Sequence, residues 1–357
     1  MALVKAFTQF AEPSTTGTVG VTEGDASAVR PPKLETVQMG FFYGLNQALR
    51  DISLKINERA VTALIGPSGC GKSTYLRSLN RMNDIIEGTR VTGEVLLDGQ
   101  RIDDLPPAVL HRVRRRVQVV FQDPFSSLNP RMKVHELLAE PVRNFGLAAT
   151  RSEVTARVDR LIDVVRLPRD AGGRYPHEFS GGQRQRIAIA RALAADPDLL
   201  VCDEAVSALD VSVKAQIVNL LQDLQRDFGL ALLFISHDLA IVEHMTHRVA
   251  VMYLGQIVEI GPKANIFGAP AHPYTRALLS AVPAAQPGMA RNRIILKGDV
   301  PSPIDPPGGC RFHTRCPFAF DRCTREEPHL RQRTAGQWAA CHLDEGAETS
   351  PAWSPES

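Results

Sequence analysis

The sequence predicts an α/β fold with a parallel sheet, an antiparallel β subdomain, a helical lobe and a C-terminal extension. Three observations support this prediction. A glycine-rich loop lies between an apolar strand and a helix, short apolar runs alternate with helical segments, and residues 122–178 consist of loops and amphipathic helices. Such alternation of strands and helices favours a parallel sheet that is covered on both faces.

The composition is that of a soluble globular protein. The 357 residues are 44% hydrophobic and carry 41 basic and 39 acidic side chains, a formal net charge of +2. This balance gives no reason to expect a nucleic-acid partner. No apolar run approaches the roughly 18 residues that a membrane span requires, and the N-terminal residues lack the apolar core of a secretory signal. We therefore expect a cytoplasmic protein that meets the membrane through a partner.

The chain is predicted to have three parts. Residues 1–34 are rich in Ser, Thr, Gly, Ala and Pro without sustained periodicity, which is typical of a disordered tail. A globular α/β domain is expected over 35–262, and a Pro- and Gly-rich extension over 263–357. Alternating residues from 34 to 56 predict antiparallel strands. Further strands are expected at 61–65, 93–99, 117–121, 199–203, 231–236, 248–253 and 256–260, with a helix near 107–115.

The segment Ala63 to Thr74 reads ALIGPSGCGKST and fits the pattern of a phosphate-binding loop. Its glycines allow several backbone N–H groups to point at phosphate oxygens, and the start of the following helix adds its positive dipole end. Lys72 is expected to reach the β- and γ-phosphates, and the Ser73 hydroxyl to ligate Mg²⁺. The alternative is an ordinary glycine turn before a helix. The predicted nucleotide-binding residues of the loop are Gly66, Pro67, Ser68, Gly69, Cys70, Gly71, Lys72, Ser73 and Thr74.

A second motif places carboxylates at the end of an apolar strand. Asp203 and Glu204 follow the apolar run Leu199 to Cys202. Ligands of open α/β folds bind at the carboxyl edge of the sheet. We expect Asp203 to hold the Mg²⁺ shell and Glu204 to polarise the water that attacks the γ-phosphate. A lone acidic pair would more often be an exposed turn, but the strand and the upstream loop favour the functional interpretation.

A third motif, Phe179 to Gln183, reads FSGGQ and precedes the helical run RQRIAIARALA. Small residues before a helix leave N–H groups free to bind an anion. A second anion-binding helix start is difficult to explain within a monomer, but it makes sense if it faces the phosphate loop of another subunit. An ordinary helix N-cap is the alternative and would be preferred for this motif in isolation.

Taken together in this order, the motifs resemble those of the ATP-binding subunits of ABC transporters. Phe179 to Gln183 is similar to that family's LSGGQ signature, with Phe in place of Leu. Asp203 and Glu204 match its Walker B aspartate and catalytic glutamate. Gln122, Ser207 to Asp210, His237 and Tyr43 match its Q-loop, D-loop, switch histidine and adenine-stacking aromatic.

The resemblance implies roles for these residues. His237 and Tyr43 also have structural alternatives, a histidine at the core edge and an aromatic in a sheet. The implied catalytic residues are Glu204, His237 and Gln122. The implied Mg²⁺ ligands are Ser73, Gln122 and Asp203. The implied ATP-binding residues outside the phosphate loop are Tyr43, Ser180, Gly181, Gly182, Gln183, Asp203 and Asp210.

The family's mechanism implies several partners. Two copies, or this chain and a paralogue, would form a head-to-tail dimer with ATP between the phosphate loop of one subunit and the signature motif of the other. ATP binding would close the pair and hydrolysis would open it. Gln122 and the helical lobe would pass this motion to transmembrane permease subunits, and a solute-binding protein outside the membrane would be an indirect partner. The subunit would lie on the cytoplasmic face of the inner membrane.

Two groups of importers contribute to the resemblance. Residues 35–101, with FFYG, ALRDISLKI and LRSLNRMND, are similar to the ATPase of phosphate importers. From residue 117 onward, VVFQDPFSSLNPRM, HPYTRALLSAVP and GDVPSPIDPPGGCRFHTRCPFA are similar to the ATPase of dipeptide and oligopeptide importers. The family's permeases dock beside the Q-loop and lobe, here 122–178, and this region is of the peptide kind. We therefore predict an ATPase for peptide uptake, with phosphate uptake as the alternative.

Other classes fit the sequence less well. A soluble ABC-type ATPase for DNA repair would need a long coiled-coil insertion, and a translation-type ABC protein would carry two nucleotide cassettes. Neither feature is present. A non-enzymatic binding module is disfavoured because Lys72, Glu204 and His237 are all intact.

Four of the six cysteines lie in the extension, at Cys310, Cys316, Cys323 and Cys341. In a reducing compartment disulfides are the least expected use of them. Thiolates suit Zn²⁺ or an iron–sulfur cluster. Spacings of 5, 6 and 17 intervening residues are wider than the paired knuckles of zinc sites and fit a larger cubane better. The segment also resembles the tail of dipeptide-importer ATPases that bear a [4Fe–4S] cluster. Four reduced thiols without metal are the alternative.

Overall fold

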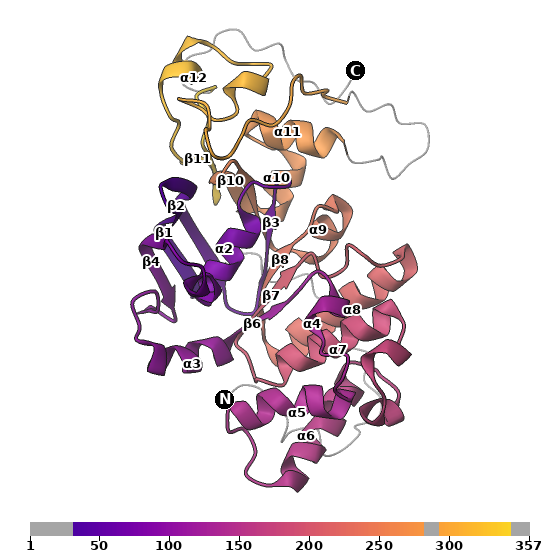
Figure 1. Cartoon of the computed structure of the whole chain (residues 1–357). Coiled ribbons are helices and arrows are strands. Elements are labelled where there is room, and N and C mark those ends of the chain that lie inside the picture. The colour runs from indigo at the N-terminus through magenta and orange to yellow at the C-terminus, as the bar shows by residue number, and fades with distance from the viewer. Residues whose placement is uncertain (1–30, 282–292, 344–357) are drawn as a thin grey trace. The chain divides into compact units, whose positions relative to one another are not determined.

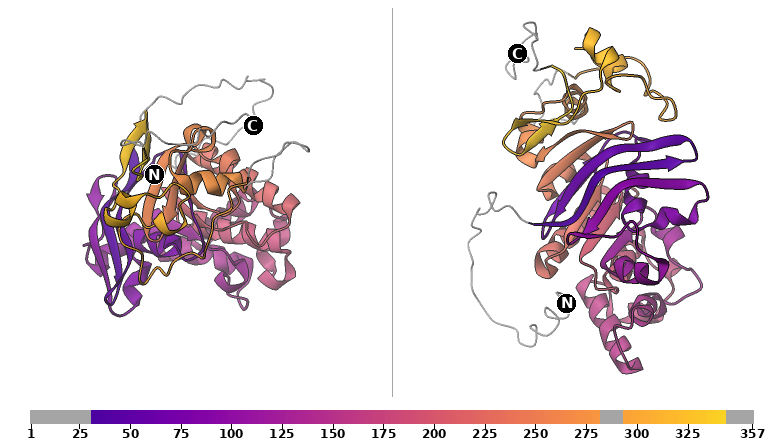
Figure 2. Two further views of the ribbon diagram at one scale, coloured as in Figure 1. Left: turned by 90° about the horizontal axis from the view of Figure 1, so that it is seen from above. Right: turned by 90° about the vertical axis from the view of Figure 1, so that its left-hand side faces the viewer.

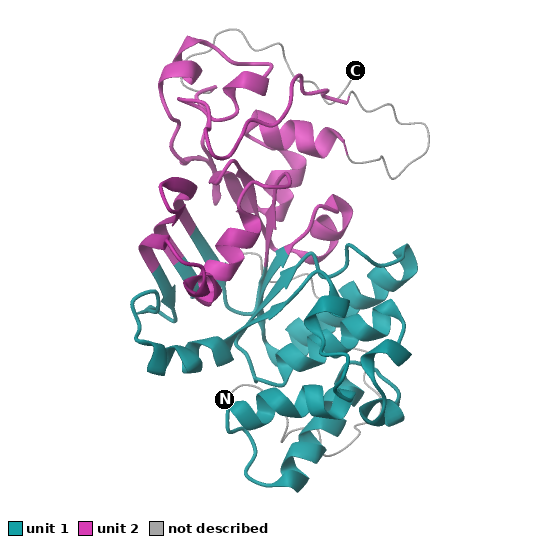
Figure 3. Ribbon diagram, viewed as in Figure 1, with its two compact units in different colours: residues 1–35, 54–61, 95–234 teal, residues 36–53, 62–94, 235–357 magenta. Residues whose placement is uncertain are grey.

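The structure is a computed structural model that describes residues 31–281 and 293–343 (Figure 1). The chain divides into two compact units, each built from separate stretches of sequence (Figure 3). Unit 1 consists of Met1–Glu35, Leu54–Val61 and Val95–Phe234, and unit 2 of Thr36–Ser53, Thr62–Glu94 and Ile235–Ser357. The predicted domain boundary at residue 262 stays a prediction.

A four-stranded sheet has the strand order β2-β1-β4-β5, and its first three strands contribute residues to both units. The long strands of this sheet can be followed in Figure 2. In β2, alternate residues Ile52, Leu54 and Ile56 are buried, as expected for a strand with one solvated face. The strand bounds are β1 Pro32–Tyr43, β2 Asn46–Asn57, β4 Thr89–Leu97 and β5 Gln100–Arg101. β4 and β5 pair antiparallel, as predicted for this subdomain.

The N-terminal boundary differs from the prediction. β1 begins at Pro32, so three residues assigned to the tail belong to a strand. The reason is packing, because the Leu34 side chain is completely buried. Residues 1–30 of the predicted tail lie outside the described residues.

Unit 1 contains strands in the order β8-β7-β6. β6 and β7 pair in parallel, from Val117 opposite Leu199 to Val120 opposite Cys202. Helices α3 and α7 contact β6, and α8 contacts α7. The bounds are α3 Pro107–Arg116, β6 Val117–Val120, α7 Gly181–Leu193, β7 Leu199–Asp203, α8 Val211–Phe228 and β8 Ala231–Ile235.

The predicted helical lobe is confirmed as a helical region of unit 1. α5 packs against α6, α7 and the 3₁₀ turn η2. α6 begins with a capping box, in which the Thr150 hydroxyl accepts from Glu153 N–H at 3.2 Å. The bounds are α4 Pro124–Ser127, α5 Val134–Asn144, α6 Arg151–Val164, η2 Arg169–Gly173 and η3 Pro176–Glu178.

Unit 2 has the strand order β11-β12-β10-β9-β3. β3 and β9 are parallel, as predicted, whereas β9 and β10 are antiparallel. The physical reason is the short connection, because a parallel pair needs a crossover of a dozen or more residues, and Tyr253 pairs with Gln256 across the turn. The bounds are β3 Val61–Ile65, α2 Lys72–Leu79, η1 Met82–Ile85, α9 Leu239–Met245, β9 Arg248–Tyr253 and β10 Gln256–Pro262.

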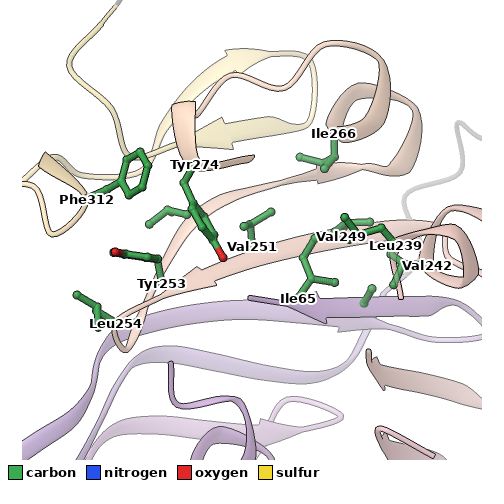
Figure 4. Packing of buried hydrophobic residues seen from close by; sticks show 12 residues of the cluster. Ile65, Leu239, Val242, Val249, Val251, Tyr253, Leu254, Ile266, Tyr274 and Phe312 are labelled. Atoms are coloured by element: carbon green, nitrogen blue, oxygen red, sulfur yellow. The ribbon is translucent and has the colours of Figure 1, made fainter. Parts of the chain in front are cut away.

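The C-terminal extension shares the core of unit 2. β12 pairs antiparallel with β10, with Glu259 opposite Ala339. Phe312 is 1% exposed and packs in one cluster with residues of β3, β9 and α11 (Figure 4). The bounds are α10 Lys263–Gly268, α11 Pro273–Ser280, η4 His313–Arg315, α12 Asp321–Arg325, β11 Arg331–Thr334 and β12 Gln337–Ala339. Among the residues that the structure describes, none of the helices has both the length and the apolar composition needed to cross a bilayer.

Candidate nucleotide site

The predicted phosphate loop lies between β3 and α2 in unit 2. All five residues of β3 are buried, so the strand fixes one end of the loop in the core. Gly71 is the N-cap of α2 at φ 104°, and no side chain of the described residues caps this helix. The N–H groups of the first helical turn are therefore left for a ligand, and an anion is the ligand they favour.

Lys72 is held inside this loop. Its ammonium group donates to the carbonyls of Gly66 and Pro67 at 2.9 Å each and lies 3.8 Å from the Cys70 sulfur. A Cβ on Gly66 would lie 2.2 Å from the carbonyl oxygen of Met252, so a side chain cannot be accommodated there without moving the backbone. The loop is thus a tight cradle of backbone groups around one cation, which suits the binding of phosphate.

The structure brings Tyr43 close to this loop. Its hydroxyl lies 3.3 Å from the Thr74 hydroxyl, and its ring contacts Phe41 edge-on with the centroids 4.9 Å apart. The Tyr43 side chain is 37% exposed, so part of the ring is accessible beside the loop. A planar base could stack on such a ring.

His237 also belongs to unit 2, between β8 and α9, and is exposed. The residues on either side of it are fixed by hydrogen bonds. The Ser236 hydroxyl accepts from Asp238 N–H at 3.0 Å, and the Asp238 carboxylate accepts from Ile241 N–H at 3.4 Å to cap α9. The histidine is therefore presented on a short, locally fixed segment.

The acidic motif lies in unit 1, where β7 ends at Asp203. Glu204 has φ 47°, a left-handed conformation that is rare for residues other than glycine. Its carbonyl accepts from the Ser207 N–H at 3.0 Å and from the Ser207 hydroxyl at 2.9 Å, which stabilises the turn. Backbone conformations of this kind are concentrated at functional sites. Gln122, also in unit 1, is exposed between β6 and α4.

The FSGGQ motif forms the start of α7 in unit 1. Ser180 is the N-cap, and it forms a capping box with Gln183, since the Ser180 hydroxyl accepts from Gln183 N–H at 3.4 Å and the Gln183 side chain accepts from Ser180 N–H at 3.0 Å. Gly182 is buried, and a Cβ on it would lie 2.4 Å from Val213 Cγ1. Within one subunit the motif is therefore a well-formed helix cap.

The contact between Gly182 and Val213 was not predicted. It places the start of α7 against the start of α8, where Asp210 is the N-cap. A Cβ on Gly181 would likewise lie 3.6 Å from Leu209. The structure thus brings the FSGGQ motif together with the segment Ser207 to Asp210. No local pattern in the sequence indicates this, because the two segments are separated by β7.

A second segment that sequence analysis did not connect with the site is the turn between β9 and β10. The N–H of Gly255 in this turn donates to the carbonyl of Cys70 in the phosphate loop at 2.9 Å. Gly255 belongs to no sequence motif, and its contact with the loop is what identifies it as part of the site's support.

The four cysteines of the extension form one neighbourhood in unit 2. Burial, and then the nearby Cys341 and Cys323, raise the pKa of the Cys310 thiol to about 11. Burial, together with the other three thiols, raises the pKa of Cys316 to about 12. The Cys310 N–H donates to the Cys323 carbonyl at 2.8 Å. Nevertheless, within the described ranges no three or more His, Cys, Asp or Glu side chains are arranged to hold a metal ion.

Comparison with known proteins identifies the class of protein. A family profile described as "ABC transporter" matches residues 49–207, and one described as "Oligopeptide/dipeptide transporter, C-terminal region" matches residues 258–323. A "Probable peptide ABC transporter ATP-binding protein", y4tS of Sinorhizobium fredii, is 51% identical over 297 residues, 83% of this chain and 82% of the relative. A "Putative oligopeptide transport ATP-binding protein", YkfD of Bacillus subtilis, is 45% identical over 327 residues, 90% of this chain and 98% of the relative.

Similar solved structures point to the same class of protein. A subunit of an ABC transporter complex from Clostridium perfringens is 27% identical with a TM-score of 0.60, covering 67% of this chain and 91% of that one. An ATP-binding cassette solved as a dimer with ADP and phosphate is 26% identical with a TM-score of 0.57, covering 64% of this chain and 98% of that one. The chain belongs to the ATP-binding proteins of ABC transporters. It is an ATPase of the transporter type and has the ABC nucleotide-binding fold, and this class of enzyme uses ATP with Mg²⁺.

Proposed function

We propose that this chain is the ATP-hydrolysing subunit of an importer of dipeptides or oligopeptides. The observation that carries the proposal is the match of residues 258–323 to the C-terminal region of oligopeptide and dipeptide transporters. A relative named as a peptide ABC transporter protein, at 51% identity, and one named for peptide import, at 50%, support it. The match includes part of β10, α10 and α11 and reaches Cys323, so it covers much of the described extension.

The residues around the phosphate loop fit ATP and Mg²⁺. The glycine cradle and the uncapped start of α2 support phosphate binding, with Lys72 as the cation that would turn from the loop carbonyls toward phosphate oxygens. Ser73, Gln122 and Asp203 would hold Mg²⁺, which would neutralise charge on the phosphates. Tyr43 would stack on the adenine. Glu204 would accept a proton from the attacking water, and His237 would orient the reacting groups.

The role of Glu204 is tested by Glu204→Gln, which keeps the size of the side chain but removes the base. Steady-state hydrolysis should fall by about 10²–10⁴-fold, because that is the usual contribution of a positioned general base, while nucleotide binding should persist. Glu243→Gln, on the exposed face of α9, is the matched control and should hydrolyse ATP at the wild-type rate. Normal hydrolysis in Glu204→Gln would remove this assignment.

The proposed working form is a dimer of two ATPase subunits on the cytoplasmic face of the membrane, bound to permease subunits. The FSGGQ motif supports it, because it resembles the family's signature, which faces the phosphate loop of a second subunit, and Ser180 is exposed at the start of α7. Gly181, Gly182 and Asp210 would lie at the same interface. In size-exclusion chromatography with ATP, Glu204→Gln should elute as a dimer at concentrations where the nucleotide-free protein is monomeric. Elution as a monomer in both conditions would contradict this.

The substrate class is tested by complementation. If the helical lobe 122–178 selects the permease, this subunit should restore peptide uptake in cells that lack their own peptide-importer ATPase. It should fail in cells that lack the phosphate-importer ATPase. The opposite pattern would show that residues 35–101, which resemble phosphate importers, determine the partner.

We further propose that Cys310, Cys316, Cys323 and Cys341 hold a [4Fe–4S] cluster. Within the described residues no group of three or more His, Cys, Asp or Glu side chains is arranged to hold a metal ion. The support comes from the cysteines themselves, because the thiols of Cys323 and Cys341 act electrostatically on both Cys310 and Cys316. Four neighbouring cysteines suit a cubane of iron and sulfide, which is held by four cysteine thiolates. Its role would be to stabilise the extension, and no catalytic step is assigned to it.

Anaerobic purification tests the cluster. The wild-type protein should be brown and contain about four iron atoms per chain, as a cubane held by four cysteines requires. Cys316→Ser should lose the colour, whereas Cys202→Ser, in β7, should keep it. A colourless protein with one zinc would refute the cluster but keep a metal site, and a protein without metal would remove both.

A further inference from the structure

The turn between β9 and β10 contacts the phosphate loop and supports it. The Gly255 N–H donates to the Cys70 carbonyl at 2.9 Å, and the Gly255 carbonyl accepts from Arg50 N–H at 2.9 Å. The end of β9 also touches the loop directly, since Met252 O limits the space at Gly66. The position of Cys70, and with it the end of the loop, therefore depends on where this turn lies.

The turn itself has an unfavourable backbone. Leu254 has φ 43° and Gly255 has φ 78°, so both central residues are left-handed. Such a pair makes a tight hairpin, but the first position normally takes Asn, Asp or Gly. A leucine there costs on the order of 1–2 kcal/mol. Leu254 is also 2% exposed. A strained and buried turn of this kind needs contacts from outside to hold it in place.

Those contacts come from the C-terminal extension. The Arg311 guanidinium donates to the carbonyl of Leu254. The next residue, Phe312, packs on Tyr253 with the ring centroids 5.4 Å apart. Figure 4 shows the rings of Phe312, Tyr274 and Tyr253 next to one another, with Leu254 following Tyr253. Arg311 is 7% exposed, so its hydrogen bond to Leu254 is protected from water.

A second part of the extension holds the flanks of the same turn. The Glu327 carboxylate forms an ion pair with Arg50 at 2.9 Å and accepts from the side chain of Gln256. Arg50 is the residue whose N–H binds the Gly255 carbonyl. Residues 311–312 and 327 thus contact the turn at its centre and at both flanks.

We propose that Arg311 is a positioning residue for nucleotide binding, acting on the phosphate loop through Leu254 and Gly255. The inference rests on the proposed nucleotide site at the loop. The path has two links, from Arg311 to the Leu254 carbonyl and from the Gly255 N–H to the Cys70 carbonyl. Through this path the extension sets the affinity for ATP, and it does not take part in the chemistry.

The test compares Arg311→Met with Arg311→Lys in the full-length protein. Removal of a buried hydrogen bond from a charged donor is expected to raise the KM for ATP by about tenfold, with kcat little changed because the catalytic groups are untouched. Arg311→Lys keeps a cationic donor and should recover much of the affinity. Arg325→Met is the matched control, because this arginine of the same extension is 74% exposed and pairs with Asp321, four residues earlier.

A purely structural role would lower the melting temperature of Arg311→Met and leave its KM at the wild-type value when measured well below melting. That outcome would overturn the proposal, as would equal KM values in Arg311→Met and Arg325→Met. Lys72→Ala distinguishes a failure of the proposed nucleotide site from a failure of the proposed role of Arg311. If it leaves nucleotide affinity unchanged, the proposed nucleotide site fails; if it abolishes binding while Arg311→Met has no effect, only the role of Arg311 fails.

A measurement on the wild-type protein covers the case in which Arg311→Met does not fold. Coupling between two sites is reciprocal, so nucleotide at the phosphate loop must also stabilise the segment around Arg311. A non-hydrolysable ATP analogue should slow hydrogen exchange in a peptide covering residues 310–316 as well as in the loop. A peptide covering α3, which belongs to unit 1, serves as the internal control and should not change. Unchanged exchange at 310–316 would refute the inference.

Discussion

The buried carboxylate of Glu259 joins three segments of unit 2, and its replacement by glutamine gives a well-defined prediction. Glu259 lies in β10 and is completely buried. It accepts from the backbone N–H groups of Ala271 and His272 at 2.8 and 2.9 Å, and from the Gln337 side chain at 2.8 Å. It therefore ties β10 to the start of α11 and to β12.

The magnitude follows from the number of donors. One carboxylate oxygen serves Ala271 and Gln337, and the other serves His272. In Glu259→Gln one of these oxygens becomes an NH₂ group, so at least one buried donor faces another donor. The loss of one such bond, together with the loss of charge assistance at the others, is expected to cost about 2–3 kcal/mol. At about 2–4 °C per kcal/mol for a unit of this size, this corresponds to a fall of about 4–12 °C in melting temperature.

His272 cannot remove the conflict by changing its protonation. Burial lowers its pKa to about 3, so its ring is neutral at physiological pH. Its Nδ1 already accepts from Tyr274 N–H at 3.0 Å to cap α11. The capping geometry and the N–H that faces Glu259 are therefore both fixed.

Differential scanning calorimetry of the full-length protein is the assay. Glu259→Ala should melt below Glu259→Gln, because it leaves all three donors without the carboxylate. Glu243→Gln, an exposed residue of the same charge in α9, is the control and should melt with the wild type. If Glu259→Gln melted within about 1 °C of the wild type, the hydrogen-bond argument would be wrong.

Two further predictions concern unit 1. Gly182→Ala should destabilise the protein by about 1–3 kcal/mol through overpacking, because the new methyl would lie 2.4 Å from Val213 Cγ1. Val213→Ala in the same chain should restore most of this loss of stability. Equal destabilisation with and without Val213→Ala would show that this contact is not the cause. Burial opposes ionisation of Asp98, but hydrogen bonds from Lys33 and Arg116 prevail and lower the pKa of its carboxyl group. A carboxyl group whose pKa is lowered in the folded state stabilises the protein at pH values above its ordinary pKa near 4, and this stability is lost as the pH falls through the folded-state pKa. Urea titrations at several pH values should therefore show that the free energy of unfolding falls less steeply with decreasing pH in Asp98→Asn than in the wild type. Identical acid-side slopes would contradict this account.

The individual strands and the phosphate loop of this protein could be predicted from the sequence. β3, β7 and β9 begin and end at the residues predicted for them. The phosphate loop lies between β3 and α2, where the motif requires it. These features depend on residues that are neighbours in the chain, such as an unbroken apolar run followed by glycines. Local sequence contains the physical information that determines them.

The tertiary structure decided the contacts between distant segments. The antiparallel direction of β10 follows from the short turn after Tyr253, which the alternation of strands and helices does not indicate. The contact of Gly182 with Val213 depends on how two helices pack.

The support of the phosphate loop by Gly255 and Arg311 has the same origin. Neither residue lies in a nucleotide motif. The hydrogen bond from Gly255 to Cys70 requires the turn to lie against the loop, and the one from Arg311 to Leu254 requires the extension to pack on the turn. A hydrogen bond requires its donor and acceptor to approach within about 3 Å, and for residues far apart in the sequence only the folded chain determines whether they do.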